Sequence, residues 1–350
     1  MVTVMPNLGS PGEFADNLLD DEIENDVDVN SEHEIIVLKL SESDCGQRVD
    51  KVIARLLPQF SRNRIQTWLE DGSILLDGQV ARVKATVYGD EEVTISPQPQ
   101  PEENAFTPQA MPLQIVHEDD TIIVLNKPAG LVVHPAPGNW SGTLLNGLLH
   151  HCPALAGVPR AGIVHRLDKE TSGLMVIAKT LEAHADLVRQ LQARTVKREY
   201  LALVWGKPVI SGTVDKPMAR DPRERVKMAV SNQDNAKAAL THFRRLATGV
   251  LEQRPVSLVL CQLETGRTHQ IRVHMQALGF PLVGDGLYGK SHLAFVFHRQ
   301  ALQARRLGLL HPKTGELDVW QIDLADDFLE LLGRAGIKME DVTLEAIVEE

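Results

Sequence analysis

A polar turn between two apolar runs is the feature that most constrains how this 350-residue chain can fold. In GIVHRLDKETSGLMVIAKT, residues 162–180, the runs GIV and LMVIA enclose His165, Arg166, Asp168 and Lys169. Short apolar runs bounded by Gly and polar residues indicate two strands joined by a turn. Polar side chains at such a place are expected where function overrides folding preference. The alternative is an ordinary turn in which Asp168 accepts hydrogen bonds from nearby backbone N–H groups.

The segments around this turn predict a sheet-rich domain. Strand-like segments outnumber helical ones from residue 113 onward, and most connections between them are short. Strands are expected at 121–127, 130–135, 198–206 and 256–264, and helices at 141–151, 181–194 and 268–279. This pattern favours a mixed, largely antiparallel α+β fold over a doubly wound parallel sheet.

The net charge of −11 is distributed unevenly along the chain. Residues 1–36 contain ten acidic residues and no Lys or Arg, and residues 314–350 have a net charge of −9. Residues 37–313 therefore have a net charge of +8. A basic body can bind a polyanion locally even when the whole chain is acidic.

Composition divides the chain into five segments. Residues 1–34 are acidic and lack hydrophobic periodicity, which predicts a disordered tail. The Pro-rich segment 97–112 predicts a linker between a small domain at 46–96 and a large domain at 113–325. Residues 326–350 are predicted to form a second acidic tail.

The small domain reads as two helices followed by a hairpin. Ser61 is the expected N-cap of the second helix, and the pair Asp77-Gly78 is a strong signal for a tight turn. Five basic side chains lie outside the apolar face: Arg48, Arg62, Arg64, Arg82 and Lys84. The arrangement resembles an S4 RNA-binding domain, and its basic side chains suit contacts to RNA. A small domain whose surface is basic by coincidence is the alternative.

Cysteine usage and the N-terminal sequence predict a cytoplasmic protein. The three cysteines, Cys45, Cys152 and Cys261, are too few and too widely spaced for a disulfide framework. The first residues show neither the basic start nor the apolar core of a signal peptide. No apolar run approaches the roughly 20 residues of a membrane span.

Neither a metal nor an organic cofactor is predicted. His150, His151 and Cys152 are adjacent in sequence, but no second His or Cys pair has the spacing of a zinc site. The sequence also contains no glycine-rich phosphate-binding loop.

A second polar cluster follows a strand in LETGRTHQIRVH, residues 263–274. Arg267, His269 and Arg272 fall on the first turns of a predicted helix, where anions bind readily. Apolar residues alternate with Arg272, and a partly buried arginine requires a carboxylate partner. A solvated cationic helix is the alternative.

At this point the sequence resembles a known family. HRLDKETSGLMVIAK resembles the signature of the RluA family of pseudouridine synthases, which act on ribosomal RNA and tRNA. KREYLALV (197–204), LETGRTHQIRVHMQALGFPLVGD (263–285) and RQALQA (299–304) match its later motifs in order and spacing. The resemblance covers residues 46–325, and the S4-like domain points to the subtype acting on large-subunit ribosomal RNA.

The resemblance implies that uridine is isomerised to pseudouridine within RNA, and it assigns three catalytic residues. Asp168 would be the catalytic carboxylate, either attacking C1′ as a retaining glycosidase nucleophile does or abstracting the C2′ proton. Tyr200 would stack on the uracil and assist removal of the C5 proton. Arg272 would pair with Asp168.

RNA-binding residues are expected around this site. The resemblance implies that Arg166 fills the space left by the flipped base, and that His165, Lys169, Arg267 and His269 contact the RNA. A basic loop that carries Arg220, Arg223, Arg225 and Lys227 faces RNA or, alternatively, only solvent. Glu170 and Gln303 depart from the family's usual Asp and His, and no role is assigned to Gln303.

Two other functions stay open at this stage. A nucleoside glycosidase would use the same carboxylate to release free uracil, and an assembly factor would bind ribosomal RNA without chemistry. We expect a monomer that acts on a ribosomal RNA stem-loop, free or within pre-ribosomal particles. Which uridines react is not decided by the sequence.

Overall fold

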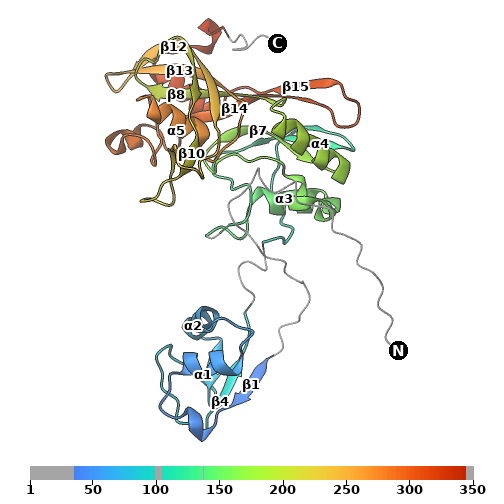
Figure 1. Cartoon of the computed structure of the whole chain (residues 1–350), viewed down its shortest axis with the longest axis vertical. Coiled ribbons are helices and arrows are strands. Elements are labelled where there is room, and N and C mark those ends of the chain that lie inside the picture. Colours follow the sequence, from blue (N-terminus) through green and yellow to red (C-terminus); the bar gives the residue numbers. More distant parts are fainter. Residues whose placement is uncertain (1–34, 99–104, 137, 344–350) are drawn as a thin grey trace. The chain divides into compact units, whose positions relative to one another are not determined.

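The computed structural model describes residues 35–98, 105–136 and 138–343, which form two compact units that divide between Ala105 and Phe106 (Figure 1). The acidic segment 1–34 lies outside the described residues, as do 99–104 of the predicted linker and 344–350. None of the helices in the described ranges has both the length and the apolar character needed to cross a bilayer.

The small unit packs two helices against a four-stranded antiparallel sheet. Its elements are β1 (Ile36–Lys39), η2 (Glu42–Asp44), α1 (Val49–Leu56), α2 (Arg62–Glu70), β2 (Ile74–Leu76), β3 (Gln79–Val80) and β4 (Glu92–Ile95). The strand order is β1-β4-β2-β3. Ser61 caps α2 as predicted, and Asp77 and Gly78, both with positive φ, close the β2–β3 hairpin.

The predicted start of the small domain at residue 46 is too late. β1 pairs with β4, with Ile36 opposite Ile95 and Lys39 opposite Glu92. The strand has four residues and its partner lies almost sixty positions further along the chain, so no local turn signal announces it. A short edge strand of this kind becomes recognisable only through its pairing.

The large unit contains the remaining elements. The strands are β5 (Ile115–Glu118), β6 (Ile122–Lys127), β7 (Ser172–Ala178), β8 (Lys197–Trp205), β9 (Ser211–Asp215), β10 (Met218–Arg220), β11 (Met228–Val230), β12 (Leu240–Leu251), β13 (Arg254–Leu263), β14 (Leu302–Leu310) and β15 (Leu317–Gln321). The helices are α3 (Leu144–His151), α4 (Leu181–Gln192), α5 (Gln270–Ala277) and α6 (Asp326–Arg334), with 3-10 turns η4 (Pro153–Gly157), η5 (Pro159–Gly162), η6 (Ser291–Val296) and η7 (Met339–Asp341).

One large sheet organises this unit and confirms the predicted mixed, largely antiparallel α+β fold. Within the described residues its nine strands run in the order β5-β6-β7-β14-β8-β13-β12-β9, and β15 pairs with β14. Among the strand pairs that the structure describes in this sheet, only β14–β7 is parallel. At Gly173 (φ 120°) a side chain would collide with the backbone of Ala304, so glycine allows β14 to pair there.

The central strands are buried on both faces. Along β8, Tyr200, Ala202 and Val204 join an apolar cluster with α3 and α5, whereas Leu201 and Leu203 join a second cluster with α6. Alternation along the strand therefore assigns each face of β8 to different helices. Figure 1 shows α5 beside β8 and β13.

Three sequence expectations for this unit are wrong. Residues 130–135 form no strand, because the carbonyls of Val132 and Val133 accept hydrogen bonds from the first N–H groups of α3. Residues 106–112 do not act as linker: the Gln109 N–H donates to Asn146 O at 2.9 Å, and the Asn146 side chain donates to Thr107 O at 2.9 Å.

The third correction concerns the acidic tail predicted from residue 326. Residues 326–334 form α6, whose Phe328, Leu331 and Leu332 are buried in the second cluster. These three residues lie at positions i, i+3 and i+4, as in an amphipathic helix. The net charge of the whole segment, on which the prediction of a tail was based, does not show this spacing.

Candidate active site

Asp168 lies on the turn that precedes β7. Its carbonyl accepts the Thr171 N–H at 3.0 Å, which closes the turn, and its side chain is 16% exposed. The segment before the turn is tied to β7 by an isolated bridge between Ile163 and Ile177. The carboxylate therefore sits on a rigid turn and remains open to a ligand.

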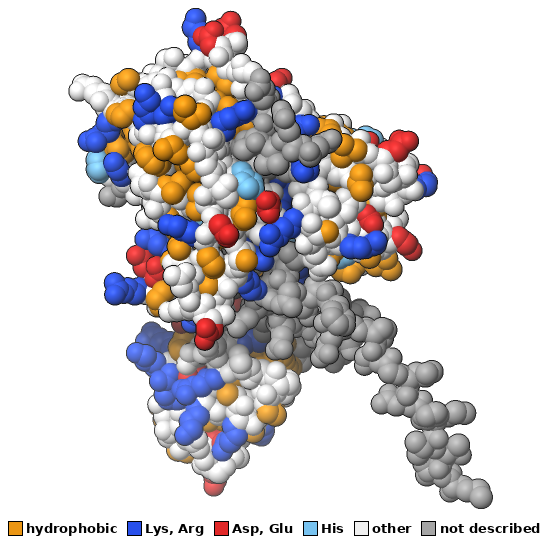
Figure 2. Space-filling view, turned by 45° about the horizontal axis from the view of Figure 1, so that its top comes forward, with side chains coloured by type: hydrophobic (Ala, Val, Ile, Leu, Met, Phe, Trp, Pro, Cys, Tyr) orange, Lys and Arg blue, Asp and Glu red, His pale blue; other side chains and the backbone are white. Residues whose placement is uncertain are grey.

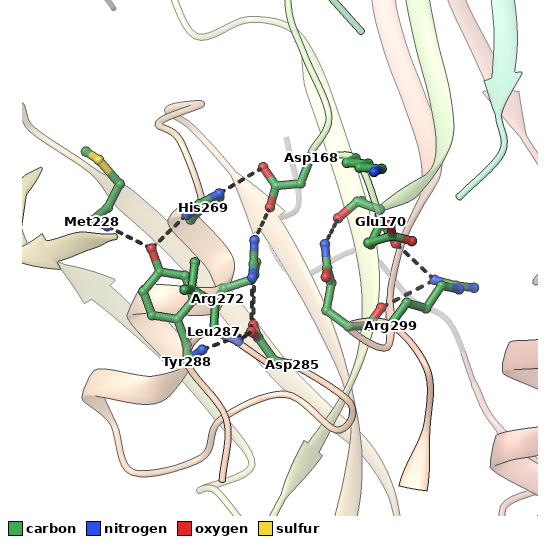
Figure 3. A network of polar contacts seen from close by, with 12 residues as sticks. Asp168, Glu170, Met228, His269, Arg272, Asp285, Leu287, Tyr288 and Arg299 are labelled. Carbon is green, nitrogen blue, oxygen red and sulfur yellow. Dashed lines mark hydrogen bonds and ion pairs between the residues drawn. The ribbon is translucent and has the colours of Figure 1, made fainter. Parts of the chain in front are cut away.

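Arg272, on α5, reaches Asp168 from 104 positions along the chain (Figure 3). Its Nη1 donates to Asp168 Oδ2 at 2.9 Å, and only 7% of its side chain is exposed. The structure thus brings together the two residues that the sequence paired. One carboxylate oxygen of Asp168 is held by the guanidinium, and the other is left for chemistry.

Asp285 anchors Arg272 and was not singled out from the sequence. Its oxygens accept from Arg272 Nε at 2.7 Å and Nη2 at 3.0 Å, and the backbone N–H groups of Leu287 and Tyr288 donate to Oδ1 at 2.9 Å. Burial lowers the pKa of Arg272, but its bonds to Asp285 and the charges of both carboxylates outweigh burial and raise it. Arg272 is therefore a permanent cation in a fixed orientation. The need of a buried arginine for carboxylates was the available signal.

His269 and Tyr288 border the same carboxylate. His269 Nε2 is 4.0 Å from Asp168 Oδ1, and its Nδ1 is 2.7 Å from the Tyr288 hydroxyl. The Arg272 guanidinium lies over the Tyr288 ring, 5.0 Å from its centre. Burial lowers the pKa of His269, with the Asp168 charge opposing, so a neutral ring faces the carboxylate.

Tyr200 projects from β8 into the cluster on the α5 face of the sheet. It is 5% exposed, and burial raises the pKa of its hydroxyl. The Asp168 charge raises this pKa further, whereas that of Arg198, two residues earlier on the strand, lowers it. Tyr200 is therefore a neutral aromatic wall within electrostatic reach of the carboxylate.

Lys127 donates hydrogen bonds to the backbone of the turn that carries Asp168, and it was not predicted from the sequence. Its buried ammonium donates to the carbonyls of Pro128 and Leu131 at 2.9 Å and of Lys169 at 3.0 Å. Burial lowers its pKa to about 7, with the charges of Asp168 and Glu170 opposing. The residue next to Asp168 is thus fixed through its backbone.

Arg299 secures the other side of the turn. Its guanidinium forms a bidentate pair with Asp327 of α6, at 2.7 and 2.8 Å, and its Nη1 donates to Glu170 O at 3.5 Å. Figure 3 shows this contact beside Asp168. Gln303, which stands where the resembled family usually has His, donates to Asp323 O at 2.7 Å and accepts the Ala325 N–H at 2.9 Å. Both residues thus bond to α6 or to the residues just before it, and Arg299 also bonds to the turn that carries Asp168.

The residues near the turn that were predicted to contact RNA differ in their exposure. Arg166 and Lys169 are exposed beside Asp168, whereas Arg267 is half-buried and donates through Nε to Ala238 O at 3.1 Å. The position of His165 contradicts the expectation that it contacts RNA, because its side chain is buried. Its buried Nε2 accepts the Val176 N–H at 3.1 Å, and burial lowers its pKa to about 3. It is a neutral structural residue, because it is buried and its ring accepts a hydrogen bond from the backbone of β7.

The remaining basic candidates lie on a hairpin of the large unit and on the small unit. Arg220 and Arg223 are exposed around the β10–β11 connection, where Arg220 donates to Arg225 O at 2.7 Å. In the small unit, Lys and Arg side chains gather on the visible face (Figure 2). The Arg64 guanidinium lies over two adjacent aromatic rings, 5.1 Å from the centre of Phe60 and 4.9 Å from that of Trp68.

One buried carboxylate organises part of this basic surface. Asp50 accepts from Arg48 at 3.0 Å, from Arg62 at 2.9 and 3.0 Å and from Gln66 at 2.6 Å. The two arginine side chains remain 42% and 49% exposed. They are therefore held in place with much of their surface open to a polyanion.

The chemistry available at Asp168 is that of a partly exposed carboxylate that is bonded to a fixed cation and has an aromatic side chain within electrostatic reach. Such a group can attack an electrophilic carbon or accept a proton. Among the described residues, no group of three or more His, Cys, Asp or Glu side chains is arranged to hold a metal ion.

Comparisons with known proteins agree with this geometry. A sequence model of the RNA pseudouridylate synthase family matches residues 121–277, and one of the S4 domain matches residues 47–93. The ribosomal large subunit pseudouridine synthase D of Nitrosomonas europaea is 48% identical over 305 residues, covering 85% of this chain and 87% of that protein. The protein of the same name from Pseudomonas aeruginosa is 49% identical over 300 residues, covering 82% and 91%.

A solved structure shares the fold of much of this chain. Human RNA pseudouridylate synthase domain containing 1 superposes with a TM-score of 0.52 at 27% sequence identity, covering 68% of this chain and 91% of that one. Given identities near 48% over most of both chains, this chain belongs to the RNA pseudouridylate synthase family and carries an N-terminal S4 domain.

Proposed function

We propose that this protein isomerises uridine to pseudouridine within large-subunit ribosomal RNA. The observation that carries the proposal is the Asp168–Arg272 pair, which presents a partly exposed carboxylate on a fixed cation. The names of the relatives support the choice of ribosomal RNA. The S4 domain and the basic hairpin suit a polyanionic substrate.

Asp168 serves the reaction by either of two routes. In the first, Oδ1 forms a bond to C1′ as N1 leaves with the bonding electrons, and C5 of the turned base later displaces the carboxylate. In the second, the carboxylate removes the C2′ proton as the C1′–N1 bond breaks, and returns a proton to C2′ once C5 has bonded to C1′. On both routes C5 loses its proton and N1 gains one, so no redox partner is required.

The neighbouring residues position the base and the carboxylate. Tyr200, a buried aromatic side chain on β8, provides a face for the detached uracil and assists removal of the C5 proton. Arg272 orients Asp168 through a single oxygen. Arg166 and Lys169, exposed beside the turn, contact the strand from which the nucleotide flips. Flipping costs a few kcal/mol, which such contacts offset.

The remaining parts of the proposal concern the setting of the reaction. The S4 domain and the hairpin residues Arg220 and Arg223 add affinity for a ribosomal RNA stem-loop, free or in a pre-ribosomal particle. The protein works as a cytoplasmic monomer. The catalytic domain extends to α6, because Asp327 fixes Arg299 beneath the catalytic turn.

Release of tritium from RNA labelled at uridine C5 tests the function. We expect the wild type to release tritium from large-subunit ribosomal RNA transcripts, and Asp168→Ala to do so at least ~10⁴-fold more slowly. Asp234→Ala removes an exposed aspartate and is the matched control, with wild-type rates expected. Free uracil that keeps its tritium would reveal a glycosidase instead. Tight binding without any reaction would reveal an assembly factor.

A further inference from the structure

A chain of polar contacts runs from the β10–β11 hairpin to Asp168 (Figure 3). The N–H of Met228, the first residue of β11, donates to the Tyr288 hydroxyl at 2.8 Å. That hydroxyl is 2.7 Å from Nδ1 of His269, and Nε2 of His269 is 4.0 Å from Asp168 Oδ1. Two side chains therefore lie between the hairpin and the carboxylate, and the last of them is 4.0 Å from it, just beyond hydrogen-bond distance.

The chain of contacts selects one tautomer of His269. A tyrosine hydroxyl has one proton and two lone pairs, and at Tyr288 one lone pair accepts the Met228 N–H. If the hydroxyl donates to Nδ1, the ring proton lies on Nε2 and faces the carboxylate. The opposite tautomer leaves the hydroxyl proton without an acceptor among the described residues and points a ring lone pair at Asp168.

Protonation states agree with this reading. Burial raises the pKa of Tyr288 to about 12, so its hydroxyl keeps its proton at neutral pH. Burial lowers the pKa of His269, so the ring carries a single proton. Which nitrogen bears that proton then depends on the Tyr288 hydroxyl.

The hairpin is packed against the elements that carry these residues. Met218 of β10 and Val273 of α5 form a small apolar cluster against which Met228 and Tyr288 pack. His274 Nε2, 3.0 Å from Lys216 O, ties α5 to the residue two positions before β10. A displacement of the hairpin is therefore transmitted to α5 and to Tyr288.

The tip of the hairpin is built to receive a polyanion. Arg223 and Arg225 are exposed, and Asp221 Oδ1 accepts the N–H groups of Arg223 at 2.8 Å and Glu224 at 3.1 Å, which fixes the turn. A phosphate backbone bound here engages the same hairpin that positions the Met228 N–H.

Resting on the proposed function, we propose that Tyr288 and His269 are positioning residues that couple RNA bound at the β10–β11 hairpin to the orientation of Asp168. Arg272 fixes Oδ2, and the Nε2–H of His269 faces Oδ1, the oxygen that reacts. RNA that seats the hairpin places the Met228 N–H, which orients the Tyr288 hydroxyl and so the ring of His269.

Nitrogen NMR of ¹⁵N-histidine-labelled protein tests the tautomer without RNA. At pH 7.5 the wild type should show His269 with a protonated Nε2 and a bare Nδ1, the signal being assigned by its loss in His269→Gln. Tyr288→Phe keeps the ring beneath Arg272 but removes the hydroxyl, and should give a mixture of tautomers. A wild-type proton on Nδ1, or a Tyr288→Phe spectrum identical to the wild type, would overturn the inference.

Single-turnover kinetics at saturating RNA test the coupling. Tyr288→Phe should lower the rate constant for pseudouridine formation about 10- to 100-fold, as small misplacements of reacting groups do, with Kd for RNA within about twofold. The double variant Arg223→Ala/Arg225→Ala should lower both affinity and rate constant. Added to Tyr288→Phe, it should lower the rate constant no further, because both changes interrupt one pathway.

The control is Arg189→Ala, which removes an exposed arginine on α4 far along the sequence from the hairpin. Its effect on the rate constant, however small, should multiply with that of Tyr288→Phe. If the protein is active and the effects of Arg223→Ala/Arg225→Ala and Tyr288→Phe on the rate constant also multiply, the coupling is refuted. A wild type that forms no pseudouridine would refute the proposed function instead, and would leave the tautomer measurement standing.

Discussion

The two units use arginine and carboxylate groups in opposite arrangements. In the small unit one buried carboxylate, Asp50, holds Arg48 and Arg62, whose side chains are 42% and 49% exposed. The buried member cannot meet a ligand, so this unit presents two cations.

In the large unit the buried member is the cation. Arg272 is 7% exposed and joins the fully buried Asp285 to Asp168, which is 16% exposed. This unit therefore presents an anion. Each buried charge is compensated by several hydrogen bonds, as a desolvated ion requires. The comparison teaches that one kind of ion pair serves binding or chemistry according to which partner faces out: cations suit a phosphate backbone, and a carboxylate suits a sugar carbon or its proton.

The largest effect is expected from removing the buried cation. Arg272→Met leaves Asp285 buried without its partner and frees Asp168, so the free energy of unfolding should fall by about 3–5 kcal/mol. Turnover should fall about 10²- to 10³-fold with RNA affinity unchanged. Urea unfolding and single-turnover assays measure both. Arg272→Lys keeps the charge but cannot make the bidentate bond to Asp285, and should recover only part of the loss. Full activity in Arg272→Met would contradict the view that the buried cation holds Asp168 in place for chemistry.

An intermediate effect is expected from removing the buried anion of the small unit. Asp50→Asn keeps the shape but loses the charge that holds Arg48 and Arg62, so RNA affinity should weaken about 10-fold, or about 1.4 kcal/mol, while the rate constant at saturating RNA stays unchanged. Filter binding against salt concentration measures the affinity and its slope. Asp90→Asn, at an exposed position of the same unit, is the control. A lower rate constant for Asp50→Asn at saturating RNA would show that the Asp50 cluster also acts on the chemistry and not on binding alone.

A separate effect, on the pH dependence of stability rather than on RNA binding or turnover, concerns Lys127, a buried cation held by carbonyls rather than by carboxylates. Burial lowers the pKa of Lys127 to about 7 in the folded chain, whereas an ordinary lysine, as in the unfolded chain, has a pKa of 10.5. Between these values the unfolded chain binds a proton that the folded chain does not, so stability rises with pH by up to about 1.4 kcal/mol per pH unit. Lys127→Met removes this titration. The difference in unfolding free energy between wild type and variant should therefore move in favour of the wild type from pH 7 to pH 9. A difference independent of pH contradicts the assignment.

Sequence reasoning reached the centre of the site but not its supports. Asp168 and Arg272 became candidates because each lies in a dense polar motif and because a buried arginine needs an acid, and the family resemblance then paired them. Asp285, Tyr288 and Lys127 carry no such local signal. Asp285 ends a motif of apolar and glycine residues, and the ammonium of Lys127 is satisfied by backbone carbonyls, whose positions depend on two separate loops.

The errors have a common physical origin. His165 sits beside Arg166 in the motif, yet His165 is buried and bonded to the backbone of β7 whereas Arg166 is exposed, and this difference depends on how the segment packs on the sheet. The acidic segment from residue 326 was judged by charge, although its apolar residues recur at helical spacing and pack on the sheet.

The sequence by itself determined the mixed α+β class and the S4-like unit, because local periodicity and motif composition are written in neighbouring residues. Its resemblance to a known family proposed Asp168 as the reacting carboxylate and Arg272 as its partner. Only the tertiary structure decided which charges are buried and which are presented, how Asp285, Arg299 and Lys127 brace the turn, and how the hairpin reaches His269 through Tyr288. These choices depend on contacts between distant segments, whose burial and hydrogen bonding arise only when the sheet has assembled.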